Sequence, residues 1–291
     1  MTEPVHSLAV DPERGRVAAL GRGAWLFDGG AWKGIPIPSA LQPQEGERDV
    51  ARIHFGRDFL PRIMGARIGP DGPRQLYLRF RFGAWRAEER EQAAFAGKPH
   101  AALYGVLGWD DPEVLCKVGK FCLIKQRSGW SQVPLPIEPP KTALRIDLGT
   151  NGAYALLERH LLRLGDEAWQ AVGGEGPWQG LPGGAWIDEQ GGWVTAPDED
   201  AIYRSRGDGW QRHASPVDEP RGLWSPDGRQ LWVAGRNGAG YFDGRSWYRV
   251  GDIDGPLSEV IGLGEQIWFA GPGGVWSARH SVSAAAARSA D

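Results

Sequence analysis

The residues best suited to bind a metal ion or to move protons are six histidines, and their spacing indicates no common site. They are His6, His54, His100, His160, His213 and His280. None belongs to an HxH, HExxH or HxxxH arrangement, the spacings that bring two imidazole rings together on one element. Histidines from different units of a ring could still meet on its axis, but these six do not recur at one position of the repeat described below. We therefore expect no histidine metal site.

Other motifs that carry chemistry are missing from the sequence. Asp252, Asp254 and Glu259 lie close together, but a calcium loop needs more oxygen ligands at alternating positions, so a polar turn is the better interpretation. No GxSxG, GxxxxGK[ST] or helix-opening GxGxxG occurs. The glycines of 235–240 and 271–274 belong to hairpins, because no helix follows them. We expect no catalytic residue, no bound metal ion and no cofactor.

The two cysteines, Cys116 and Cys122, flank a predicted hairpin turn at 118–120. A three-residue turn would place them opposite each other, close enough to form a disulfide bond, whereas a two-residue turn would place them on opposite faces. In a reducing compartment we expect two free thiols.

Six tryptophans follow short turns that contain glycine or aspartate, at intervals of 37 to 53 residues. They are Trp32, Trp85, Trp130, Trp169, Trp210 and Trp247. A recurring Trp can bind a sugar or can pack between repeated units. Its fixed place in the repeat favours packing, so we expect these side chains to be mostly buried.

The elements that carry these tryptophans are short strands. Segment 221–250 contains four apolar or aromatic runs, separated by turns at 226–228, 236–238 and 243–244. Asn-Gly and Asp-Gly supply the positive φ angles of tight hairpins. The segment therefore predicts a four-stranded antiparallel meander, which needs similar neighbours to bury both of its faces.

The repeat resembles a known family. Residues 231–250, LWVAGRNGAGYFDGRSWYRV, and 23–38, GAWLFDGGAWKGIPIP, resemble two-component-regulator-type propeller repeats. WSPDGRQLWV (224–233) is similar to a TolB-like signature, and AWQAVGG (168–174) is faintly similar to tectonin-type repeats. The resemblance implies an all-β, seven-bladed β-propeller with four-stranded antiparallel blades and an atypical last blade. The predicted blades are 5–38, 49–91, 101–136, 141–174, 180–216, 220–250 and 257–280, followed by a disordered or closing tail, 281–291.

Blade 7 contains three predicted strands and lacks the Trp-bearing fourth. Either the tail at 281–288 or the first five residues could supply it. Without a fourth strand the ring would keep an open sheet edge.

Blade 2 departs most from the repeat. Its strand 75–82 alternates, with Leu76, Leu78, Phe80 and Phe82 on one face and Gln75, Tyr77, Arg79 and Arg81 on the other. The two arginines could pair with acids or contact a partner. Segment 87–100 is the only predicted helix and would project from the ring.

Loops on a rigid scaffold commonly carry recognition. In a propeller, the turns between strands two and three share one face with the connections between blades. We expect a protein partner to dock on that face near blades 2 and 3. The candidate contacts are Arg79, Arg81, Phe95, Arg22, Asp198, Arg236, Asn237 and Asp252. The predicted function is a non-catalytic protein-interaction scaffold, a subunit or regulator of a larger assembly; the alternatives are a carbohydrate-binding propeller lectin and an enzyme with a site in the central channel.

Composition excludes other partners. The chain of 291 residues has a net charge of −3 and a pI near 6.1, and no polybasic run. We therefore expect no nucleic-acid or membrane binding. The first residues lack the basic and apolar regions of a secretory signal, so we expect a cytoplasmic protein.

Overall fold

The structure, a computed structural model, is built almost entirely from strands. It describes residues 2–39, 42, 48–49, 51–55, 59–69, 72–87, 103–107, 113–117, 121–126, 129–136, 145–149, 152–165, 168–188 and 190–279. Within these residues the strands β1 to β28 are joined by turns and by one short 3₁₀ helix, Pro197–Glu199.

The strands form seven antiparallel sheets, or blades, each in sequence order except at the inner edge of blade 2. Blade 1 contains β1 (Val5–Asp11), β2 (Arg16–Gly21), β3 (Ala24–Asp28) and β4 (Trp32–Ile35). Blade 2 contains β5 (Arg48–Asp49), β6 (Arg52–Phe55), β7 (Pro61–Gly69), β8 (Gly72–Arg81) and β9 (Ala84–Ala87). Blade 3 contains β10 (Leu103–Leu107), β11 (Glu113–Lys117), β12 (Phe121–Gln126) and β13 (Gly129–Pro134). Blade 4 contains β14 (Arg145–Gly149), β15 (Gly152–Leu156), β16 (His160–Leu164) and β17 (Trp169–Glu175).

The remaining blades follow the same plan. Blade 5 contains β18 (Ala185–Asp188), β19 (Gly191–Ala196), β20 (Ala201–Arg206) and β21 (Gly209–Ala214). Blade 6 contains β22 (Gly222–Trp224), β23 (Leu231–Gly235), β24 (Gly238–Phe242) and β25 (Trp247–Val250). Blade 7 contains β26 (Glu259–Leu263), β27 (Gln266–Gly271) and β28 (Gly274–Arg279).

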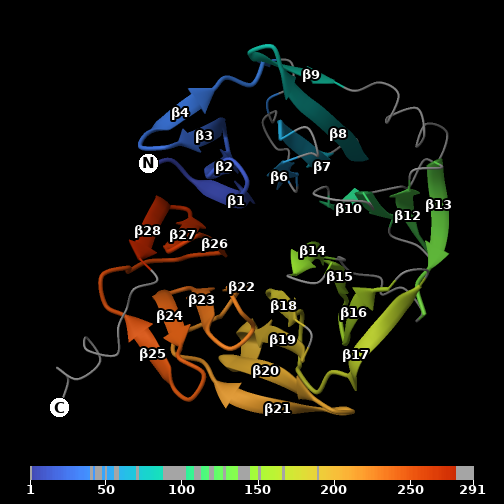
Figure 1. The fold of residues 1–291 in the computed structure, drawn as a ribbon, viewed down its shortest axis with the longest axis vertical. Helices are drawn as coiled ribbons and strands as arrows, with labels where there is room; N and C mark the ends of the chain where they lie inside the picture. Colours follow the sequence, from blue (N-terminus) through green and yellow to red (C-terminus); the bar gives the residue numbers. More distant parts are fainter. Residues whose placement is uncertain are drawn as a thin grey trace.

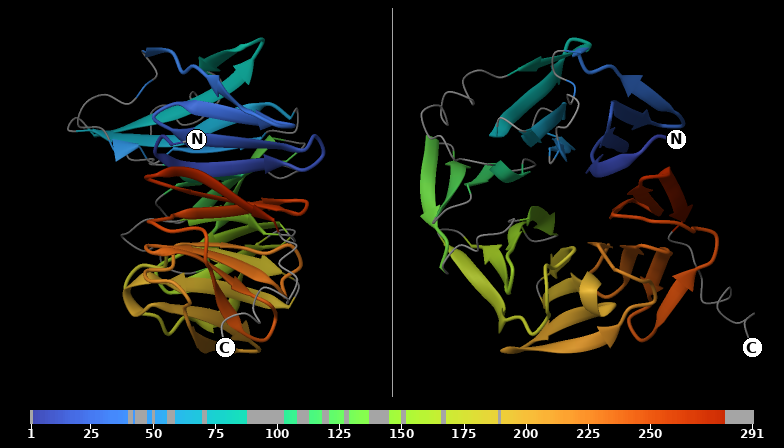
Figure 2. Two further views of the ribbon diagram at one scale, coloured as in Figure 1. Left: turned by 90° about the vertical axis from the view of Figure 1, so that its left-hand side faces the viewer. Right: turned by 180° about the vertical axis from the view of Figure 1, so that it is seen from behind.

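The seven sheets stand around one axis, with the first strand of each blade nearest the centre (Figure 1). The N-terminus begins blade 1, which lies beside blade 7, as the view from behind also shows (Figure 2). This arrangement confirms the predicted seven-bladed β-propeller with an atypical last blade.

Turn chemistry fixes the hairpins of blade 6. The side chain of Asp227 accepts hydrogen bonds from the backbone N–H groups of Arg229 and Gln230, at 2.9 and 2.8 Å. The side chain of Asp243 accepts equivalent hydrogen bonds from the backbone N–H groups of Arg245 and Ser246, at 2.7 and 2.8 Å. Gly228 and Gly244 follow these aspartates with φ angles of 73° and 96°, which a residue with a Cβ rarely adopts.

Aromatic packing joins neighbouring blades. Trp193, on the second strand of blade 5, packs on Phe242 and Trp247 of blade 6, with ring centroids 5.5 and 6.3 Å apart. Of the six recurrent tryptophans, Trp85 and Trp169 are each 4 % exposed. The side chains of Trp32, Trp210 and Trp247 have intermediate burial, so they are less completely enclosed than those of Trp85 and Trp169, and the side chain of Trp130 lies outside the described part of the chain.

The seam between the last and first blades repeats this packing. Trp268 of β27 lies against Phe27 and Trp32 of blade 1, with ring centroids 4.8 and 5.6 Å apart. Val5 starts β1, the innermost strand of blade 1, so the first residues do not complete blade 7. Among the described residues, no strand pairs with the outer edge of β28.

Blade 2 is irregular at its inner edge, because β5 and β6 both pair with β7. The predicted alternation of β8 holds for Leu78 and Phe80, which pack toward blade 1. It fails for Phe82: the strand ends at Arg81, and Phe82 lies in the turn to β9 with a φ of 51° and an exposed fraction of 90 %.

Several expectations fall on residues outside the described ranges. They are the helix in 87–100, the contact at Phe95, most of the linker 39–48 and the tail 281–291. For the cysteines only the backbone register is described: Cys116 is opposite Cys122 in the β11–β12 pair, as the three-residue turn predicts.

Candidate functional site

One face of the ring collects the turns between second and third strands together with the connections between blades. This follows from the antiparallel order of every sheet: strands one and three end at one face, and strands two and four end at the other. The β2–β3 and β23–β24 turns, the segment 215–221 and the segment 251–258 therefore share a face. We call it the connection face, and the opposite one the hairpin face.

A glycine at the end of the second strand lets the chain cross closely on this face in blades 1, 6 and 7. A Cβ atom added at Gly21, Gly235 or Gly271 would overlap the carbonyl oxygen of the residue entering the same blade, which is Pro4, Asp218 or Pro256. Two hydrogen bonds hold the crossing in blade 6: the Arg236 N–H donates to the Asp218 carbonyl at 2.7 Å, and the Gly235 carbonyl accepts from the N–H of Leu257, which enters blade 7, at 2.9 Å. The residues beside this crossing are thus fixed in place.

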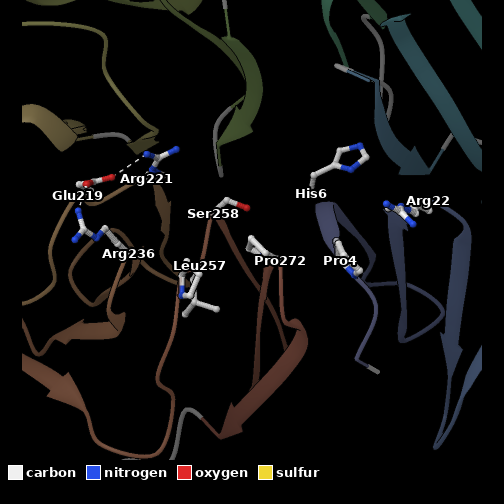
Figure 3. Close-up of a pocket in the computed structure, with 12 residues that line it drawn as sticks. Pro4, His6, Arg22, Glu219, Arg221, Arg236, Leu257, Ser258 and Pro272 are labelled. Carbon is white, nitrogen blue, oxygen red and sulfur yellow. Dashed lines mark hydrogen bonds and ion pairs between the residues drawn. The ribbon is translucent and has the colours of Figure 1, made fainter. Parts of the chain in front are cut away.

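A pocket of about 590 Å³ opens on the connection face where blades 6, 7 and 1 meet (Figure 3). The three blades contribute equivalent positions: the residues entering the blade, and the residue after the strand-end glycine. The lining residues are Pro4, Val5, His6, Gly21, Arg22, Glu219, Arg221, Arg236, Pro256, Leu257, Ser258 and Pro272.

The blade 6 side of the pocket is a preorganised ion cluster. Glu219 accepts one hydrogen bond on each carboxylate oxygen, from Arg236 Nη1 at 2.7 Å and from Arg221 Nη2 at 2.9 Å. Its backbone has a φ of 42°, a strained conformation for a residue with a side chain, and its N–H donates to the Asp200 carboxylate at 2.7 Å. The hydrogen bonds from Arg236 and then Arg221 lower the pKa of Glu219. Both arginines still expose much of their guanidinium groups.

The blade 1 side carries a histidine at a β-bulge and an exposed arginine. The β1–β2 register skips His6, because Val5 pairs with Gly21 and Ser7 pairs with Leu20. Bulges re-aim side chains at functional rims, and the ring of His6 lies on the pocket side, where its Nε2 donates to the Ala51 carbonyl at 3.2 Å. Arg22 has no ion pair or hydrogen bond to any other described residue.

Blade 7 supplies the neutral middle of the pocket. Its equivalent positions are Pro256, Leu257, Ser258 and Pro272, so no charged group stands between the two cationic sides. Leu257 is buried, whereas both prolines are exposed. With His6 neutral, the charged side chains that line the pocket are three arginines and one glutamate, so the lining itself has an excess of positive charge.

The residues proposed from the sequence do not form one site. The pocket unites Arg22 and Arg236. Asn237 has a structural role, because its side-chain oxygen accepts the Asp218 N–H at 2.9 Å. Asp198 and Asp252 are exposed on the connection face outside the pocket lining.

The candidates in blade 2 are separated from the pocket. Arg81 lies at the β8–β9 turn and therefore on the hairpin face, which corrects its assignment to the connection face. There its guanidinium lies 5.9 Å from the centroid of the Phe82 ring. Arg79 is half-buried within β8 and interacts inside the protein, so it is not a free surface cation.

Sequence reasoning missed His6, Glu219 and Arg221. They carry no motif, and they meet only because the ring closes. Aligning the blade entries Pro4-Val5-His6, Glu219-Pro220-Arg221 and Pro256-Leu257-Ser258 is the signal that would have revealed their equivalence.

Within the described residues, no three His, Cys, Asp or Glu side chains are grouped so as to hold a metal ion. No helix in that part of the chain has the length and apolar character needed to cross a membrane.

No protein-family model matches the sequence, and no curated protein sequence matches it significantly. Solved structures do match. Virginiamycin B lyase from Staphylococcus aureus aligns with a TM-score of 0.65 at 14 % identity, covering 94 % of each chain. YCF48 from Cyanidioschyzon merolae aligns with a TM-score of 0.66 at 13 % identity, covering 96 % of this chain and 97 % of that one.

A third match is the extracellular domain of the putative hybrid two-component system BT3049 from B. thetaiotaomicron. Its TM-score is 0.59 at 13 % identity, and the alignment covers 94 % of this chain and 40 % of that one. The chain shares the β-propeller fold of these proteins. At such low identity the likeness extends to the fold alone, and the fold hosts enzymes as well as binding proteins.

Proposed function

We propose that this protein is a non-catalytic propeller that binds a protein partner, as a subunit or regulator of a larger assembly. An extended segment of the partner lies in the pocket between blades 6, 7 and 1. The observation that carries the proposal is the pocket itself, which crosses three blades on the connection face and has cationic sides, the one in blade 6 held by Glu219, around a neutral middle. Concave sites with an apolar surface and a few placed polar groups are typical of ligand recognition.

Similar folds support a peptide ligand. YCF48 has been solved with a D1 peptide bound, and that complex aligns with this chain at a TM-score of 0.66 and 13 % identity. The proposal places the docking site at blades 6, 7 and 1 instead of blades 2 and 3, because Arg81 lies at the hairpin face and Arg79 is half-buried and already has an interaction within the protein.

A carbohydrate ligand has weaker support. It was suggested by the recurrent tryptophans, but Trp32 and Trp247 pack edge-on against Trp268 and Trp193 of neighbouring blades. Those contacts engage the rings on which a sugar would stack.

The test is affinity capture from the native cell with three proteins: the wild type, Arg22→Glu and Arg245→Glu. Arg245 is an equally exposed arginine at the β24–β25 turn on the hairpin face, so it is a matched control. A partner of this pocket is enriched by the wild type and by Arg245→Glu and is lost with Arg22→Glu. Equal recovery by all three proteins, or binding only on a glycan array, would contradict the proposal.

A further inference from the structure

We infer that the pocket recognises an extended ligand that has one carboxylate at each end of a short apolar stretch. The inference rests on the proposed function for the source of that ligand, a peptide segment of the partner. It depends on three features of the pocket: where its cations lie, which of them are already neutralised, and what lies between them.

The cations form two separate groups. Arg22 belongs to blade 1, and Arg221 and Arg236 belong to blade 6. Blade 7 separates the groups, with proline, leucine and serine at the positions where its neighbours carry proline, histidine and arginines. A ligand that spans the pocket therefore meets positive charge at its ends and a neutral, mostly apolar surface at its middle.

The two groups differ in how they are held. Arg221 and Arg236 share Glu219, which orients both guanidinium groups, and among the side chains that line the pocket this side keeps an excess of one positive charge. The carboxylates of Asp200 and Asp218 also lie near Arg236, outside the lining, so this side is the weaker of the two cationic groups. An arginine that is already oriented loses less side-chain entropy when it binds a second carboxylate. Arg22 has no anionic partner among the described residues. Its guanidinium group can therefore donate two hydrogen bonds to one carboxylate, as a bidentate pair.

The neutral middle selects what joins the carboxylates. The exposed prolines 256 and 272 offer apolar contact, and among the lining residues of blade 7 the only polar side chain is Ser258. A charged or strongly hydrated group in the middle of the ligand would lose water without gaining a partner. The favoured peptide is therefore acidic at both ends and apolar between them.

The chemistry has two possible sources, a free dicarboxylic acid or an acidic peptide. The probes are acetyl-Glu-Pro-Leu-Glu-amide, its neutral counterpart acetyl-Gln-Pro-Leu-Gln-amide, adipate and adipamide. Each is titrated at low ionic strength into the wild-type protein and into Arg22→Gln, Arg236→Gln and Arg245→Gln, and binding is followed by shifts of backbone amide signals in NMR spectra. All three arginines are exposed, so the variants are expected to fold, and thermal unfolding checks this.

The acidic peptide is expected to bind at least tenfold more tightly than its neutral counterpart, and adipate more tightly than adipamide. Arg22→Gln weakens binding of the acidic peptide at least tenfold, Arg236→Gln weakens it severalfold, and Arg245→Gln leaves it unchanged. Equal binding of both peptides would overturn the inference and leave peptide binding, the proposed function, intact. Binding of adipate alone would support the carboxylate site and contradict the protein partner. Absence of binding by every probe, or binding that ignores Arg22 and Arg236, would overturn the inference.

Discussion

At the scale of single residues, the least expected feature is a fully buried histidine. His54 of β6 is 8 % exposed, and neither ring nitrogen has a hydrogen-bond partner among the described residues. Burial, and secondly the nearby charge of Arg62, lowers the pKa of His54 to about 3. Nothing in the sequence indicated this burial, because a histidine in a strand of mixed composition can lie at the surface or in the core.

The pH dependence of stability should report this burial. Below pH 6.5 the unfolded chain protonates the imidazole of His54, whereas the folded protein resists protonation until about pH 3. The contribution of His54 to the free energy of unfolding is therefore constant above pH 6.5 and decreases as the pH is lowered toward 3, by up to about 1.4 kcal/mol per pH unit. We predict that the free energy of unfolding, measured with urea at several pH values between 4 and 7, depends less steeply on pH for His54→Gln than for the wild type. Identical slopes would contradict it, because all other titrating groups are shared.

A second residue-scale prediction concerns Phe82. Its φ of 51° and that of Gly83, 78°, form a turn that favours Asn-Gly. The ring is 90 % exposed, so little burial offsets the strain. Phe82→Asn should leave stability unchanged or raise it by about 0.5–1 kcal/mol in urea unfolding. A loss of more than 1 kcal/mol would show that the exposed ring has a stabilising contact that the turn geometry does not explain.

At the scale of elements, the turns were the most predictable part of the chain. Asp227-Gly228 and Asp243-Gly244 form hairpin turns because short-range chemistry alone determines them. The same reasoning failed at Phe82 and Glu219, which adopt positive φ angles without a turn-forming residue type. At Glu219 the hydrogen bonds with Asp200, Arg221 and Arg236 hold the conformation, and at Phe82 the tight turn between β8 and β9 imposes it, so the residue type at neither position indicated a positive φ.

The strand-end glycines show how elements position the site. A Cβ atom added at Gly235 would lie 2.5 Å from the Asp218 carbonyl oxygen and 2.6 Å from Val217 Cγ2. We predict that Gly235→Ala costs about 1–3 kcal/mol, the usual range for overpacking, and displaces the neighbouring Glu219. Gly209→Ala is the control, since its Cβ would meet nothing within 4 Å. Urea unfolding measures both; an equally stable Gly235→Ala would mean that the crossing has room to adjust.

At the scale of the whole molecule, ring closure creates what the sequence could not show. The pocket combines residues near 5, 220 and 257, and its function depends on blades 1 and 7 being adjacent. Closure does not use a shared strand among the described residues. It uses the Trp268 contacts and an ion pair between Arg52 of blade 2 and Glu259 of blade 7, with Nη1 and Oε1 2.9 Å apart.

The seam should therefore be the place where the ring opens first. Trp268 and Trp193 occupy equivalent positions, and each packs on a Phe-Trp pair of the next blade, but only the blades joined by Trp193 are also linked by a short segment of chain. Replacing either by alanine should cost about 3–5 kcal/mol. We predict that Trp268→Ala accelerates amide hydrogen exchange selectively in β1, β2 and β26–β28, because no chain segment joins blades 7 and 1 once their packing is weakened. Trp193→Ala should leave these strands protected. Mass spectrometry of exchanged peptides distinguishes the two, and a uniform increase around the ring in Trp268→Ala would show that the seam is no weaker than the other blade contacts.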